Sequence, residues 1–146
     1  MRLLIQRVKE ATVKVENQVC GQIKKGLLVF LGIHKEDSDV KIGWLANKLV
    51  TLRIFPDTEG KMNQDIRQVE GDILVVSQFT LYGNCLSGRR PDFIESAGPE
   101  IALPLYEKFI LQTTEALGKP VQSGKFGALM EVCLINDGPV TFLVER

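Results

Sequence analysis

The sequence has little histidine and little cysteine. It contains one histidine, His34, and three cysteines at positions 20, 85 and 133, which lie far apart and form no C-x-x-C pair. One histidine cannot build a histidine-based metal cluster. An odd number of scattered cysteines is typical of reduced thiols rather than of a disulfide framework. We therefore expect a cytoplasmic protein with no metal and no cofactor.

The chain also lacks an excess of charge and a long apolar run. Its 18 basic and 18 acidic residues cancel, so no global field attracts nucleic acid, and any contact with nucleic acid must be local. The apolar runs are short and strand-like, far from the ~20 residues that a membrane span needs. The opening stretch MRLLIQRVKEATV meets charge too early for a secretory signal. No membrane partner is expected.

Standard catalytic signatures are missing as well. The sequence contains no G-x-S-x-G nucleophile elbow and no phosphate-binding P-loop. An enzymatic activity must therefore be carried by residues outside these motifs.

What the sequence does contain is a globular pattern of strands and helices. Its 146 residues and 45% hydrophobic content indicate one domain over residues 1–146. Apolar and β-branched runs predict strands over residues 3–16, within 17–26, over 27–33 and from 72 toward a loop at 83. Apolar residues spaced by three and four predict amphipathic helices over residues 37–55 and 103–118.

Local signals predict where these elements end. A residue among 37–39 can cap the first helix. Pro104 fits the first turn of the second helix, and Gly118 followed by Pro120 ends it. An Asn-Asp-Gly turn at 136–138 then predicts a hairpin between apolar runs 126–135 and 140–146. The predicted fold is α+β, a mainly antiparallel β-sheet with a barrel-like core and two amphipathic helices.

Three stretches are unusual for a purely structural role. In SQFT, three polar side chains surround one aromatic at the end of a buried strand, where a site can be held rigidly; alternation pairs Gln78 with Thr80. A strand capped by turn-forming residues is the alternative. In GRRPDF, Arg89 and Arg90 are either a solvated pair or contacts to phosphate. In NDGPVTF, Pro139 stiffens the backbone and removes one backbone hydrogen-bond donor. A hairpin turn requires neither of these effects.

Together these residues resemble the D-aminoacyl-tRNA deacylase family, the bacterial and eukaryotic type that acts on D-tyrosyl-tRNA(Tyr). The resemblance covers essentially the whole chain, and SQFT followed by GRRP and NDGPVT is its specific part. Departures are small: Gly83 stands where alanine is common, Ser123 where threonine is common, and Pro104 lies inside the family's second helix. The other matching stretches are QRV, KGLLVFLGI, LRIF, EGKMN, VVSQFTLYG and FGALMEV.

The resemblance implies a homodimer that hydrolyses the ester bond of D-aminoacyl-tRNA, with glycine mischarged on tRNA(Ala) as a second candidate substrate. It implies that the Gly138-Pro139 peptide is cis and enters the active site of the partner subunit. Two rigid carbonyls there would hold the α-amino group of the substrate and leave no room for an L side chain. Ordinary L-aminoacyl-tRNA would thus be rejected by collision.

The resemblance also implies roles for single residues. The ribose 2′-OH of the terminal adenosine helps to activate the water or the ester, so the site needs no side-chain nucleophile. Backbone amides near Phe79 polarise the ester carbonyl. The predicted catalytic residues are Thr80, Gln78 and Phe79; the predicted substrate-binding residues are Ser77, Phe126, Gly127, Ala128, Met130, Gly138 and Pro139; and Arg89 and Arg90 are predicted to contact tRNA.

Two other classes of function stay open from the sequence. One is a related editing domain that removes an L-amino acid, such as L-serine from threonyl-tRNA; the intact Gly138-Pro139 pair argues against it. The other is a non-enzymatic nucleic-acid-binding module, which the zero net charge and the lack of a basic tail disfavour.

Overall fold

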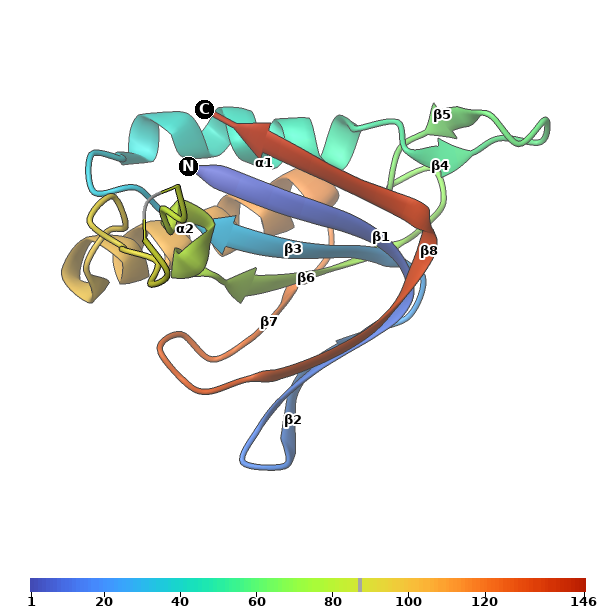
Figure 1. Ribbon diagram of the computed structural model, residues 1–146. Coiled ribbons are helices and arrows are strands. Elements are labelled where there is room, and N and C mark those ends of the chain that lie inside the picture. Colours follow the sequence, from blue (N-terminus) through green and yellow to red (C-terminus); the bar gives the residue numbers. More distant parts are fainter. Residues whose placement is uncertain (87) are drawn as a thin grey trace.

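The central element of the fold is a long first strand. In the computed structural model, which describes residues 1–86 and 88–146, β1 spans Arg2–Val15. Its first half pairs with β3 (Gly26–Gly32) and its second half with β2 (Gln18–Ile23). β8 (Glu131–Glu145) pairs with β1 along its other edge. All three pairings are antiparallel, and Figure 1 shows β1 and β8 curving together across the molecule.

Two parallel pairings extend this sheet. β6 (Asp72–Ser77) runs parallel to β3, and the short β7 (Gln122–Ser123) runs parallel to β6. β2 returns close to β7 at the far edge of the sheet. The closeness is seen at Gly21, where an added Cβ would lie 2.8 Å from the Ser123 carbonyl oxygen. The sheet is therefore nearly closed into a barrel, and the predicted α+β class with a barrel-like core and two helices is confirmed.

The first helix is shorter than the sequence predicted. A 3-10 turn, η1 (Asp39–Lys41), leads into α1 (Ile42–Thr51), and Leu52 already has extended backbone. The apolar spacing continues past the helix because Leu52 packs on the same core in its extended conformation. β4 (Phe55–Pro56) and β5 (Met62–Gln64) follow as a small hairpin. No residue from 37–39 caps a helix through its side chain, among the caps described for η1 and α1.

Asp37 instead joins the two ends of the chain. Its buried carboxylate accepts hydrogen bonds from the Met1 ammonium (2.9 Å) and the His34 amide (2.7 Å). Met1 also donates to the Arg146 carbonyl oxygen at 2.7 Å. Burial alone raises the pKa of the Asp37 carboxyl, but its hydrogen bonds with Lys41 and Met1 outweigh burial and hold that pKa below its usual range.

The second helix begins earlier than predicted. α2 spans Pro99–Leu117, with Pro99 at the position where a missing N–H costs nothing. Pro104 therefore lies inside the helix rather than in its first turn, as an exposed residue. Gly118 ends the helix as predicted, with a φ of 79° that favours glycine. No helix of the described part has the length and apolar character to cross a membrane.

The predicted C-terminal hairpin is wrong. Residues 131–145 form one strand, and both of its halves pair with β1, from Glu131 opposite Lys14 to Glu145 opposite Arg2. The register shifts only where β1 passes Gln6–Glu10. A 14-residue β1 is long enough to pair with both apolar runs, so the Asn-Asp-Gly-Pro stretch forms an irregularity within one strand instead of a reversal.

Two apolar cores lie on the two faces of this sheet. The larger one fills the space between the sheet and both helices, and the helices cover that face in Figure 1. The smaller one lies inside the curl and contains Val8, Val13, Leu28 and Leu74. Because alternate residues of β3 and β6 enter different cores, these strands are apolar without interruption. Phe30 and Met130 partly cover the smaller core.

Candidate active site

A cavity opens at the carboxyl end of β6, where the sheet passes into the loops that carry the predicted site residues. Its volume is about 590 Å³, within the range of small-ligand sites. The ends of β3 and β6 line it, together with the start of η2 (Phe79–Tyr82), residues 93–102 and residues 126–132. Seven of the predicted site residues share this lining: Ser77, Gln78, Phe79, Phe126, Gly127, Ala128 and Met130.

The SQFT stretch turns out of the sheet directly after β6. Ser77 ends the strand, and the Gln78 amide donates to the Leu31 carbonyl of β3 at 2.8 Å. Gln78 Nε2 donates to Thr80 Oγ1 at 2.6 Å, which brings these two side chains together as predicted. Thr80 is exposed and does not line the cavity. The backbone amides of Phe79 and Thr80 have no acceptor within the described part of the chain, as is usual for a first helical turn.

A second aromatic residue fixes the position of Phe79. The Phe79 ring is 55% exposed, and its centroid lies 5.0 Å from that of Phe93 in an edge-to-face contact. Ser96 Oγ donates to the Phe79 carbonyl oxygen at 3.4 Å. Sequence reasoning missed Phe93 and Ser96, although the Gly98-Pro99 pair that follows them signals a helix start beside the site.

The loop from Gly124 to Met130 forms the facing wall and is fastened to β6. The Gly124 amide donates to the Val75 carbonyl at 2.9 Å. The buried Tyr106 hydroxyl of α2 reaches the carbonyl oxygens of both Val75 (3.0 Å) and Gly124 (3.3 Å). Burial raises the pKa of Tyr106 to about 12, so this group stays a donor. The Tyr106 ring also lies against Phe126, with centroids 5.6 Å apart.

The Gly138-Pro139 pair lies apart from this cavity. Both residues are exposed on β8, and neither lines the cavity of its own chain. The peptide bond between them is cis. A Cβ added at Gly138 would collide with the backbone nitrogen of Val140, two residues on. Glycine is therefore required here by the chain's own turn.

Side chains of β1 hold this turn in place. The Asn136 amide group accepts from the Val140 N–H (2.9 Å) and donates to Gln6 Oε1 (3.1 Å). Arg7 Nε donates to the Asp137 carbonyl oxygen at 2.8 Å, and Arg7 Nη1 donates to the Ile54 carbonyl oxygen at 2.5 Å. Sequence reasoning missed Arg7, because a buried arginine cannot be distinguished from a surface one in the QRV stretch.

Arg89 and Arg90 lie at the exposed tip of the loop between η2 and α2. The base of this tip is closed by Asn84 and Asp92, whose backbones exchange hydrogen bonds of 2.9 and 3.1 Å. In the described residues neither arginine has a carboxylate partner. Because Phe93 directly follows this tip and lines the cavity, the two arginines are tethered to the cavity rim.

The chemistry available at the cavity is that of positioning and polarisation. No residue of the lining is a base that could take the Thr80 proton, and Gln78 donates to that hydroxyl. Within residues 1–86 and 88–146, no group of three histidine, cysteine or acidic side chains is placed to hold a metal ion. The lining combines the amide side chain of Gln78 and the hydroxyl of Ser77 with apolar walls, and the unpaired amides of Phe79 and Thr80 lie in the stretch that follows; such polar groups can hold and polarise an ester.

Comparison with known proteins gives one consistent family. The family model described as D-Tyr-tRNA(Tyr) deacylase matches residues 4–145. A D-aminoacyl-tRNA deacylase of Protochlamydia amoebophila is 54% identical over 145 residues, which cover 99% of this chain and 95% of that protein. The enzyme of the same name from Desulfatibacillum aliphaticivorans is 53% identical, with 99% of both chains covered.

Two solved structures share the fold. The c-Myc DNA Unwinding Element Binding Protein superposes with a TM-score of 0.94 and 36% identity, over 100% of this chain and 99% of that one. A probable eukaryotic D-amino acid tRNA deacylase superposes with a TM-score of 0.84 and 21% identity, over 98% and 97% of the two chains.

Proposed function

The chain belongs to the D-Tyr-tRNA(Tyr) deacylase family, and from this membership we propose that it hydrolyses the ester bond between a D-amino acid and the 3′ end of tRNA. The family match to residues 4–145 supports one deacylase domain over the whole of residues 1–146. We propose the cytoplasm as the location of this activity, because aminoacyl-tRNA is used there.

The observation that carries this proposal is the 590 Å³ cavity, which gathers the SQFT stretch on one wall and residues 126–130 on the other. The amides of Phe79 and Thr80 are free to donate to the ester carbonyl oxygen as negative charge develops on it. Ser77 and Gln78 orient the adenosine end. Phe126 and Met130 supply apolar walls, and Gly127 and Ala128 leave room between them.

The attacking water is activated by the substrate itself in this proposal. No side chain of the cavity lining is placed as a general base for Thr80. In its place, the ribose 2′-OH of the terminal adenosine activates the attacking water. A matched substrate that ends in 2′-deoxyadenosine, with its amino acid on the 3′-OH, should be hydrolysed slowly. Normal turnover of that substrate would exclude an RNA-assisted mechanism.

Selection of the D-form is assigned to Gly138-Pro139 of a second copy of the chain. The pair is exposed, held by Asn136 and Arg7, and absent from its own cavity, which supports a role across a homodimer interface. The apolar side chains of Ile135, Phe142 and Leu143 on β8 are also exposed, as a subunit interface would require.

Arg89 and Arg90 are assigned to tRNA phosphates. If both contact phosphate, the double variant Arg89→Ala/Arg90→Ala should weaken tRNA binding and flatten its dependence on salt. A filter-binding titration over salt concentration measures this slope. An unchanged salt dependence of tRNA binding would show that the two arginines are a solvated surface pair.

The decisive assay compares release of D-tyrosine and L-tyrosine from the same tRNA. The proposed function requires fast release of the D-form and slow release of the L-form. Glycyl-tRNA(Ala) and L-seryl-tRNA(Thr) belong in the same series, because fast release of L-serine with slow release of D-tyrosine would indicate the L-editing alternative. Tight binding without any turnover would indicate a nucleic-acid-binding module, the activity named for one of the structural relatives.

A further inference from the structure

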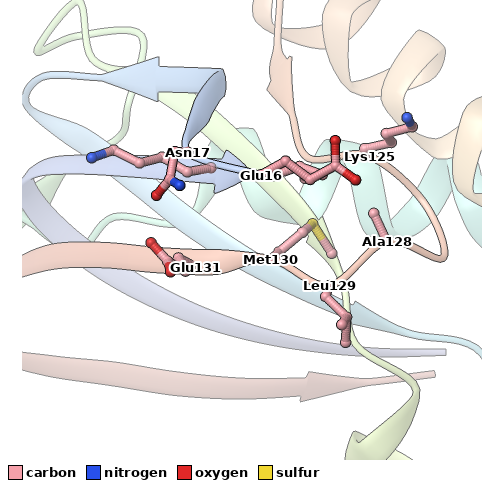
Figure 2. Close-up of a pocket in the computed structure, with 9 residues that line it drawn as sticks. Glu16, Asn17, Lys125, Ala128, Leu129, Met130 and Glu131 are labelled. Atoms are coloured by element: carbon pink, nitrogen blue, oxygen red, sulfur yellow. The ribbon is translucent and has the colours of Figure 1, made fainter.

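A second cavity, of about 530 Å³, lies beside the first. It is bounded by the tip of the β1–β2 hairpin, residues 14–17, and by residues 125–131 of the facing loop. Figure 2 shows the Glu16 side chain extending from the hairpin toward the loop that carries Lys125. Ala128, Leu129 and Met130 line both cavities. The two cavities therefore adjoin along this three-residue segment, which spans at most about 10 Å.

The polar side chains that line this second cavity have no ion-pair or side-chain hydrogen-bond partner among the described residues. Lys14, Glu16, Asn17, Lys125 and Glu131 all line it. None of the five forms an ion pair or a side-chain hydrogen bond within the described residues, although ion pairs are common elsewhere on the surface. Lys14 and Glu131 even sit opposite each other in the sheet without pairing. Two ammonium groups, two carboxylates and an amide are therefore available to a ligand.

An exposed leucine marks the wall between the two cavities. The Leu129 side chain is 95% exposed and lines both. Beside it, Met130 partly covers the smaller core. The apolar side chains of Ala128, Leu129 and Met130 together give a planar base a surface to lie against.

We propose that the second cavity binds the cytidine that precedes the terminal adenosine of tRNA. The inference rests on the proposed function, which puts that adenosine in the first cavity. All tRNAs end in the same single-stranded cytidine-cytidine-adenosine, and single-stranded RNA ends are recognised through base edges and backbone phosphates. Lys14 and Lys125 contact the phosphate between the two nucleotides. Glu16 or Glu131 accepts from the exocyclic amine of cytosine, a favourable carboxylate–base pairing.

The chemistry of the lining favours this ligand over others of similar size. Two lysines alone would suit any phosphate, but two carboxylates in the same cavity repel a ligand that is only anionic. A nucleotide with a phosphate at one end and an amine donor on its base matches both signs. Uridine lacks that amine and should be bound less well.

The test uses minimal esters of D-tyrosine with adenosine, with cytidylyl-(3′→5′)-adenosine and with uridylyl-(3′→5′)-adenosine. Measured as kcat/KM, the cytidine ester should exceed the adenosine ester by roughly ten-fold, the size of one good base contact, and should also exceed the uridine ester. Lys14→Ala/Lys125→Ala should lower the cytidine-to-adenosine ratio to about a third or less. Lys24→Ala/Lys48→Ala removes the same charge from exposed positions outside both cavities and should keep the ratio.

Each outcome decides the matter. If D-tyrosyl-tRNA is hydrolysed but cytidine gives no advantage over adenosine alone, the subsite is overturned and the proposed function stands. If the advantage is present but survives in Lys14→Ala/Lys125→Ala, the cytidine lies elsewhere. If D-tyrosyl-tRNA itself is not hydrolysed, the proposed function fails and the subsite fails with it.

Discussion

At the scale of single residues, the hydroxyl of Thr80 accepts a hydrogen bond from Gln78 and has no base beside it in the cavity lining. A positioning role follows. Thr80→Ala should lower kcat/KM for D-tyrosyl-tRNA by about ten-fold, far less than the ~10⁶ lost when the nucleophile of a catalytic triad is removed. Single-turnover hydrolysis measures this. Complete loss of hydrolysis, with substrate binding and the melting temperature unchanged, would make Thr80 the nucleophile.

Gly138 gives a second prediction at this scale. A methyl group at Gly138 would collide with the backbone nitrogen of Val140 in its own chain. Gly138→Ala should therefore displace the turn and reduce D-substrate hydrolysis, with a smaller effect on the global melt. Gly43→Ala is the control, because its Cβ would meet only Gln112 Oε1 at 3.4 Å. Wild-type activity in Gly138→Ala would show that the turn tolerates the change.

At the scale of elements, Tyr106 links α2 to β6 and to the loop that forms the second wall of the cavity. Tyr106→Phe removes one donor from two buried carbonyls and should destabilise the protein by about 1–2 kcal/mol. Because the wall is loosened, KM should rise more than kcat falls. Tyr82→Phe is a matched control, since no hydrogen bond of its hydroxyl is found in the described part of the chain. Equal losses of stability and equal rises in KM for Tyr106→Phe and Tyr82→Phe would contradict the proposal that the Tyr106 hydroxyl holds the loop against β6.

The pairing of β1 with β8 is interrupted at Gly138-Pro139, and Arg7 bridges the interruption to the chain at Ile54. Arg7→Ala leaves both carbonyls without a donor and should cost about 2–3 kcal/mol. Arg7→Lys keeps the charge but cannot reach both acceptors. If the turn selects the D-form, both variants should lower the ratio of D- to L-tyrosyl-tRNA hydrolysis. Denaturant unfolding separates that loss from instability, and an unchanged ratio in a destabilised variant would limit Arg7 to folding.

At the scale of the whole molecule, the proposed active site needs two chains. Phe126→Ala damages the cavity and Gly138→Ala damages the inserted turn, so each homodimer should lose most of its activity, for a different reason. In an equal mixture after subunit exchange, heterodimers carry one intact site, which gives about a quarter of wild-type activity for a two-fold dimer. Sedimentation checks the dimer itself. Full activity of a monomer, or no recovery on mixing exchanged chains, would contradict the arrangement.

Much of the fold was determined by the sequence. The uninterrupted apolar runs of β3 and β6 predicted buried strands, because each strand serves a core on both of its faces. Gly118 predicted the end of α2 through its left-handed backbone. Proline and apolar spacing were less reliable guides: Pro104 was placed in a first turn and Leu52 in a helix, since spacing alone does not show where backbone hydrogen bonds stop.

The site was determined only in part. The side chains of SQFT and the family resemblance of residues 126–130 predict a site, but the sequence separates these two stretches by more than forty positions. Tyr106 and the parallel pairing of β6 with β7 bring them to one cavity. Phe93 ends the GRRPDF stretch, but neither it nor Ser96 was predicted to line that cavity, because their position depends on how a loop returns to the start of α2.

What the sequence by itself determined are the strands, the helices and the polar stretches that interrupt them, since these depend on neighbours along the chain. Only the tertiary structure decided that the last two apolar runs are one strand beside β1, that Gly138-Pro139 does not line the cavity of its own chain, and that a second cavity adjoins the first. The physical reason is register: pairing across a sheet joins residues far apart in the chain, and local propensity carries no record of which strand will be the partner.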